Sequence, residues 1–194
     1  MKRILILAAA SLSFLAASAQ VNWTTDRSHS SIGFTVTHLV ISEVEGSFKT
    51  FDIAVSSPAA DNFEGAKIEF SADVASIYTG DENRDGHLKS PDFFDAANNP
   101  KITFKSTSFK KTRGNQYKLV GDLTMHGVTK SVELTAVYNG TVKDPYGNTK
   151  AGFKITGVVN RTQFGLKWNA ALETGGVVVS EDVTINCNIE LKKS

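Results

Sequence analysis

The sequence contains a single cysteine, Cys187, and only four prolines in 194 residues. One cysteine cannot form an intramolecular disulfide, so the fold must be held together by a hydrophobic core and not by covalent cross-links. An excess of charge of either sign is also missing, since 21 basic residues face 20 acidic ones. Proteins that bind nucleic acid usually carry a basic surface and a high pI, so this balance argues against a nucleic-acid ligand.

The chain also has little sustained apolar sequence. Its one long apolar stretch, residues 4–17, is too short to span a bilayer. It follows the basic pair Lys2–Arg3 and precedes the small residues Ala17-Ser18-Ala19, the pattern of a secretory signal peptide. We therefore expect cleavage of residues 1–19 and export of one domain, residues 20–194, to the periplasm or the medium. No other segment predicts a membrane span.

Apolar residues alternate with polar ones along most of the chain. In SIGFTVTH, for example, Ile32, Phe34, Val36 and His38 fall on one face of an extended strand. A tight turn is indicated at His126-Gly127, and a second turn at Asn139-Gly140, in a loop that DPYGN (144–148) extends. Eight strands are predicted in all, around residues 31–38, 46–56, 67–74, 102–104, 117–125, 128–136, 153–159 and 183–191. Sequential hairpins of this number predict an all-β fold in which an antiparallel sheet closes into a barrel, because closure removes exposed sheet edges.

The alternation stops between Ile77 and Lys101, where a long insert covers about residues 80–98. Part of it, DENRDGHLKS (81–90), could form a short helix that Pro91 ends. Long inserts in compact β domains are usually lids or binding loops, so this segment is the first place to look for function.

Two kinds of chemistry could use the insert directly. An enzyme could pair Asp85 with His87 as orienting group and base, although no G-x-S-x-G nucleophile elbow accompanies them. A calcium loop could place Asp81, Asn83 and Asp85 at its first, third and fifth positions. Asp92 stands where such a loop carries a longer glutamate, and the four histidines of the chain lack the paired spacing of a zinc site. We therefore predict no catalytic residue, no metal site and no cofactor.

Four blocks of sequence resemble one known family. They are DRSHSSIGFTVTHL (26–39), RDGHLKSPDFFDAANNPKITFKST (84–107), LVGDLTMHGVTKSVEL (119–134) and NRTQFGLKWN (160–169). In this order and spacing they are similar to the YceI-like proteins of the bacterial periplasm. The resemblance implies a lipocalin-like barrel with an elongated apolar cavity that holds an isoprenoid quinone, a prenyl phosphate or a similar amphiphile. It implies a binding protein rather than an enzyme.

The resemblance gives the alternating residues a second interpretation. From alternation alone they would fill the barrel, whereas a hollow barrel would use them to line a cavity. The expected lining residues are Phe34, Val36, His38, Phe93, Phe94, Phe104, Leu123, Met125, Phe153, Ile155, Phe164 and Trp168. The ligand headgroup or the rim of the cavity is assigned to Arg84, His87, Lys89 and Arg161, of which the arginines suit a phosphate.

Three further expectations complete the prediction. Phe93 and Phe94, on the insert, would help to cover the cavity. Cys187 alternates with Ile185 and Ile189, which favours a small buried side chain over a reactive thiol. Exposed loops leave surface that could support a homodimer.

Overall fold

The structure, a computed structural model, describes residues 20–171 and 175–194, so the predicted signal peptide lies outside the described residues. The described chain is mostly β-structure with one α-helix. The strands are β1 Val21–Thr25, β2 Ser31–His38, β3 Ser42–Phe48, β4 Phe51–Ser57, β5 Lys67–Asp73, β6 Ile77–Tyr78, β7 Lys101–Lys111, β8 Gln116–Met125, β9 Val128–Lys143, β10 Thr149–Asn160 and β11 Val179–Lys193. The helix is α1 Glu82–Lys89, and three short 3-10 turns are η1 Arg27–His29, η2 Val74–Ser76 and η3 Arg161–Phe164.

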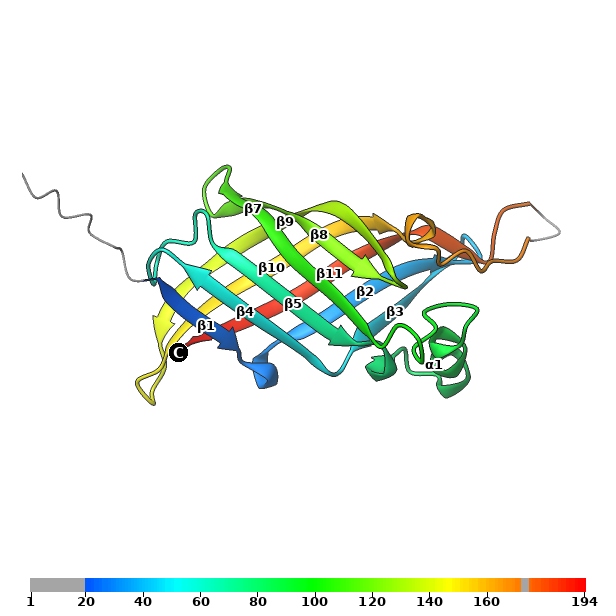
Figure 1. Cartoon of the computed structure of the whole chain (residues 1–194), viewed down its shortest axis with the longest axis horizontal. Coiled ribbons are helices and arrows are strands. Elements are labelled where there is room, and N and C mark those ends of the chain that lie inside the picture. The colour runs from blue at the N-terminus through cyan, green and yellow to red at the C-terminus, as the bar shows by residue number, and fades with distance from the viewer. Residues whose placement is uncertain (1–19, 172–174) are drawn as a thin grey trace, which may run out of the picture.

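The sheet closes into a barrel, as the sequence predicted. β1 pairs with β4 on one side and with β11 on the other, which joins β1, β4, β5, β7, β8, β9, β10 and β11 into a ring. All the pairings that hold it are antiparallel. β11 also pairs with β2, and β2 with β3, so these two strands lengthen the wall at one end of the molecule (Figure 1).

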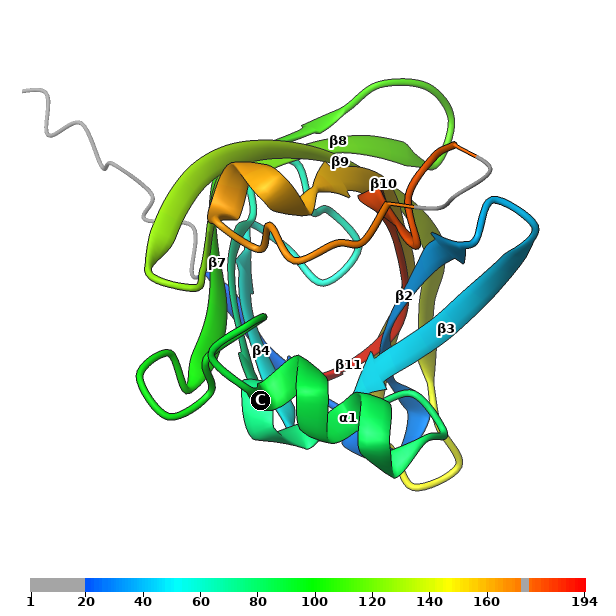
Figure 2. The same ribbon diagram turned by 90° about the vertical axis from the view of Figure 1, so that its right-hand side faces the viewer.

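The two ends of the barrel differ. Figure 2 views the end that carries α1 and the β2–β3 hairpin, which we call the mouth. The other end, which we call the closed end, is filled by aromatic side chains. The ring of Phe63, from the loop between β4 and β5, lies 5.3 Å from Trp23, 5.4 Å from Tyr138 and 4.9 Å from Phe153. Aromatic pairs at these separations stabilise a fold beyond the area that they bury.

The predicted strand over residues 46–56 is wrong in one respect, because the structure splits it into β3 and β4. Between them, the backbone N–H of Lys49 donates to the carbonyl of Ser76, and that of Thr50 donates to the Ser76 hydroxyl. These groups therefore bond to η2 and not to a neighbouring strand, which interrupts the ladder. β1 was not predicted, since a five-residue strand with one fully buried residue, Trp23, shows too little alternation.

The two predicted turns have different outcomes. His126-Gly127 does connect β8 and β9, with φ values of 50° and 72° that suit a tight hairpin turn. Asn139-Gly140 is not a turn but lies inside β9, opposite an irregularity in the pairing at Gly152. The chain reverses in the predicted extension of this loop, residues 144–148, where the backbone N–H of Asp144 donates to the carbonyl of Asn148. The helix predicted within residues 81–90 is present as α1.

Candidate ligand-binding cavity

A cavity of about 580 Å³ lies within the barrel. Its wall is drawn from strands around the whole barrel and from the insert, for instance Ile53 on β4, Phe104 on β7 and Ile189 on β11. Inward-facing positions of an eight-stranded barrel can either meet at the axis or enclose one small ligand. Here they enclose space, and the volume lies in the range of pockets that bury a small organic molecule.

Most of the predicted lining residues face this space. The lining includes Phe34, Val36, His38, Phe93, Phe94, Phe104, Leu123, Met125, Phe153, Ile155 and Trp168. Phe164 is the exception, because it sits in η3 with 1% of its surface exposed and packs into the core outside the cavity. Phe164 lies in NRTQFGLKWN (160–169), outside the alternating strands, so alternation could not predict the direction of its side chain.

Sequence reasoning missed several lining residues. Phe63 closes one end of the cavity from a loop, where alternation has no meaning. The signal available was an aromatic residue within the polar stretch DNFEG. Thr79 and Asn83 were also missed, because they flank or belong to α1 and reach the cavity only through its placement at the mouth.

The hydrogen-bonding side chains of the lining belong to segments that gather at the mouth. They are His38, Thr79, Asn83, Arg84, His87, Arg161 and Trp168, and the lining contains no aspartate or glutamate within the described ranges. These residues lie at the end of β2, on α1 and the segment between β6 and α1, and on η3 and the segment after it (Figures 1 and 2). The cavity therefore has a polar end and a long apolar end.

The helix α1 is fixed in place by its own polar side chains. The Asp81 carboxylate accepts the backbone N–H of Arg84, which caps the helix and holds the pKa of Asp81 below its usual value. The buried Asp85 carboxylate accepts both the backbone N–H (2.8 Å) and the hydroxyl (2.6 Å) of Thr79. The Arg84 guanidinium donates from Nε to the same hydroxyl and from Nη2 to the Thr79 carbonyl. Within the described residues Nη1 of Arg84 makes no hydrogen bond, so it can donate one to a ligand.

Arg161, assigned from the sequence to the headgroup or the rim, lines the cavity at the mouth but is buried, with 4% of its surface exposed. Its guanidinium donates to the backbone carbonyls of Leu166, Trp168, Val179 and Ser180. Burial lowers the pKa of Arg161, and the charge of Glu181 partly opposes this effect. Arg161 thus ties the segment after η3 to the start of β11 and leaves a positive charge in the cavity wall.

Three rings complete the mouth. The imidazole of His87 lies edge-on to Phe93 and to Trp168, with ring centroids 5.1 Å and 4.9 Å apart. Phe93 and Trp168 lie 5.1 Å from each other, and the Arg161 guanidinium stands over the Phe93 ring at 5.9 Å. These contacts join α1 and the insert to the segment after η3 across the opening. Lys89, also predicted at the rim, does not line the cavity.

The catalytic pair considered from the sequence is not assembled. Asp85 bonds to Thr79, whereas Nε2 of His87 lies 3.4 Å from the Asp92 carboxylate. The calcium loop considered from the sequence is not formed either. Residues 82–89 form a helix, and carboxylate oxygens of Asp81 and Asp85 accept hydrogen bonds from protein groups.

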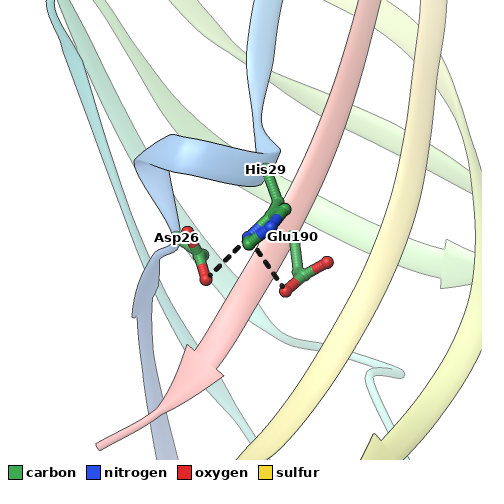
Figure 3. Close-up of side chains that lie close together, drawn as sticks. All are labelled: Asp26, His29 and Glu190. Atoms are coloured by element: carbon green, nitrogen blue, oxygen red, sulfur yellow. Dashed lines mark ion pairs between the residues drawn. The ribbon is translucent and has the colours of Figure 1, made fainter. Parts of the chain in front are cut away.

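One group of side chains elsewhere has the composition of a metal site. Asp26, His29 and Glu190 lie close together near the junction of β1, η1 and β11 (Figure 3). However, the ammonium of Lys150 on β10 bonds to the Asp26 carboxylate and, at 3.0 Å, to that of Glu190. The bond between Lys150 and Asp26 lowers the pKa of Asp26 and raises that of Lys150. Lys150 already supplies the positive charge, so the cluster serves as an ion-pair network that ties η1 and β10 to β11.

Cys187 lies in β11, is buried and faces the cavity. Burial raises the pKa of its thiol to about 11. The thiol is therefore a small apolar part of the wall, as its alternation predicted. Among residues 20–171 and 175–194, no helix is long and apolar enough to cross a membrane.

Comparison with known proteins gives a consistent result. The YceI-like domain family matches residues 23–191. A UPF0312 protein of Staphylococcus aureus strain USA300 is 40% identical over 174 residues, which cover 89% of this chain and 98% of the relative.

Solved structures share the fold. The YceI protein of Campylobacter jejuni is 29% identical and superposes with a TM-score of 0.69 over 81% of this chain and 90% of its own. A domain of Saccharophagus degradans, described as polyisoprenoid-binding and implicated in plant cell wall breakdown, superposes with a TM-score of 0.64. The superposition covers 89% of this chain and 98% of that domain, at 14% identity.

Proposed function

This chain belongs to the YceI-like family, and from that premise we propose that it is a lipid-binding protein for an isoprenoid-type amphiphile. The proposed ligand is an isoprenoid quinone or a prenyl phosphate. The protein would bind it for sequestration or transport. We propose no reaction on this ligand; Asp85 bonds to Thr79, and His87 lies beside Asp92.

The observation that carries the proposal is the cavity of about 580 Å³, whose wall is apolar except at the mouth. Burial of one five-carbon prenyl unit contributes about 4 kcal/mol gross, at about 0.8 kcal/mol per carbon. A few units therefore exceed the cost of association, which is of the order of 4–15 kcal/mol. The S. degradans domain with this fold is described as binding a ligand of the same class.

The headgroup would lie at the mouth. There, Nη1 of Arg84 and the side chains of Asn83 and His87 can donate hydrogen bonds, and Arg161 adds a positive charge. A quinone carbonyl or a phosphate oxygen accepts such bonds. We assign the site of action to the periplasm or the medium, on the basis of the signal-peptide pattern in residues 1–19.

Tryptophan fluorescence offers a direct test with geranylgeraniol as the probe. Trp168 lines the cavity, while Trp23 lies at the closed end with its indole N–H bonded to Ser57. Titration should change the emission of the wild type in a saturable way, and the change should disappear in Trp168→Phe. A wild-type spectrum that geranylgeraniol does not alter, together with no retention of the probe on gel filtration, would refute the proposal.

A further inference from the structure

Large apolar side chains are exposed beside the mouth, at the tip of the β2–β3 hairpin. Val40 and Ile41 have 69% and 84% of their surface exposed, and Val177, in the segment before β11, has 41%. The backbone N–H of Leu39 donates to the carbonyl of Val178 at 2.9 Å, so the hairpin tip and this segment lie side by side. We call residues 39–41 and Val177 the apolar tip.

The backbone of the apolar tip is unusual for the residues that it carries. Leu39 and Val40 have φ values of 52° and 66°, in the left-handed region. Backbone with positive φ favours glycine and asparagine, and a β-branched residue is disfavoured there. The turn therefore carries Val40 and Ile41 exposed to solvent, in a backbone conformation that a polar residue or glycine would adopt more easily.

The apolar tip is continuous with the cavity wall. His38 precedes it on β2 and lines the cavity, as do Val178 and Val179 on the other segment. The hairpin reaches beyond the ring of strands at the same end as α1 (Figures 1 and 2). A ligand that leaves the mouth along this wall would meet apolar side chains up to the tip of the hairpin.

The charges around the apolar tip restrict the nature of its partner. Residues 39–42 and 175–180 contain no acidic or basic side chain. Glu43 and Glu45 on β3 and Glu181 and Asp182 near the start of β11 are exposed, and we call these four residues the acidic collar. This surface is complementary to an uncharged apolar medium and repels an anionic one.

We propose that the apolar tip docks on the surface of a lipid bilayer, inserting Val40, Ile41 and Val177, so that the ligand passes between bilayer and cavity without crossing water. The inference rests on the proposed function for its purpose, because a bilayer is where a poorly soluble isoprenoid resides. Exposed apolar side chains insert at the boundary of headgroups and acyl chains. Insertion here depends on apolar contact and not on attraction between charges, owing to the acidic collar.

The test uses the protein from residue 20 to residue 194 and vesicles of phosphatidylcholine. One variant is made at each end of the barrel. Val40→Glu combined with Ile41→Glu places charges in the apolar tip. Val142→Glu combined with Tyr146→Glu places the same charges on exposed residues of the β9–β10 hairpin, at the opposite end (Figure 1). Flotation of protein with ligand-free vesicles measures docking alone. The rate at which protein extracts geranylgeraniol from vesicles, followed through Trp168, measures transfer.

We expect the wild type and the β9–β10 variant to float equally, and the apolar-tip variant to float about tenfold less or lower still. The transfer rate should rise with vesicle concentration and should fall in the apolar-tip variant, which nevertheless binds the probe in solution. A wild type that does not float, or an apolar-tip variant that floats like the wild type, would overturn the inference. Flotation without any binding of geranylgeraniol would instead refute the proposed function and leave docking in place.

Discussion

Two neighbouring valines of β10 provide a test of where the ligand lies. Val159 is buried and lines the cavity, whereas Val158, one residue earlier, faces outward with 58% of its surface exposed. Substitution of either by tryptophan makes the same chemical change on opposite faces of one strand. Only Val159→Trp should occupy space that the ligand uses.

The size of the effect follows from the atoms added. Tryptophan exceeds valine by roughly seven side-chain heavy atoms, and displacing as many ligand carbons would cost up to about 5–6 kcal/mol at about 0.8 kcal/mol each. A flexible chain can bend or leave its last unit outside, so we expect about half of this. That corresponds to an affinity about 100-fold weaker, or about 2.7 kcal/mol.

Equilibrium dialysis with tritium-labelled farnesol measures this difference. Val159→Trp could also strain the wall by about 1–3 kcal/mol, so urea unfolding of both variants is the control, and binding is compared only where each is fully folded. If Val159→Trp bound farnesol as tightly as Val158→Trp, the ligand would not lie inside the barrel and the reasoning would fail.

Three further predictions concern the polar and sulfur groups. Lys150→Met should lower the free energy of unfolding at pH 7 by about 3 kcal/mol, because it leaves the Asp26 and Glu190 carboxylates together without a cation. The folded pKa of Asp26 is depressed, so its contribution is present above its unfolded pKa of about 3.9 and is lost as the pH falls through the folded value. The gap between wild type and Lys150→Met should therefore narrow in urea titrations below pH 4, and a constant gap would contradict the assignment. Arg161→Met should cost about 2–4 kcal/mol in the same assay, since it removes the donors of four backbone carbonyls, while Lys154→Met on the exposed face of β10 should cost little. Burial raises the pKa of Cys187 to about 11, so about one part in a thousand of this thiol should be thiolate at pH 8. It should therefore react with iodoacetamide several hundred-fold more slowly than a free thiol. A rate close to that of the unfolded chain would show that the thiol is accessible.

The sequence predicted the barrel because a period of two is imposed by the geometry of a strand. Residues such as Phe34, Phe104 and Ile155 face the cavity since alternation fixes the face of every residue within one strand. The same rule has no force outside strands. Phe164 in η3 and Phe63 in a loop were therefore misplaced or missed, although both are aromatic and fully buried.

The position of the mouth could be predicted from the sequence, but the contacts that its residues make could not. The break in alternation marked residues 80–98 as the insert, and a short helix was expected within residues 81–90. The partners of Arg161 are four backbone carbonyls, two of them about 18 residues away, and carbonyl groups leave no trace in a sequence. Lys150 meets Asp26 across 124 positions for a similar reason, since only the closure of the barrel brings β1, β10 and β11 together.

The central claim is that the barrel holds an isoprenoid-type lipid, and native mass spectrometry tests it most directly. The protein would be expressed in bacteria with residues 1–19 in place, purified from the cell envelope without detergent, and extracted with organic solvent. We predict a discrete additional mass that fragments in prenyl steps and is absent from Val159→Trp. Only the mass of the bare protein, after incubation with membranes as well as after purification, would contradict the account.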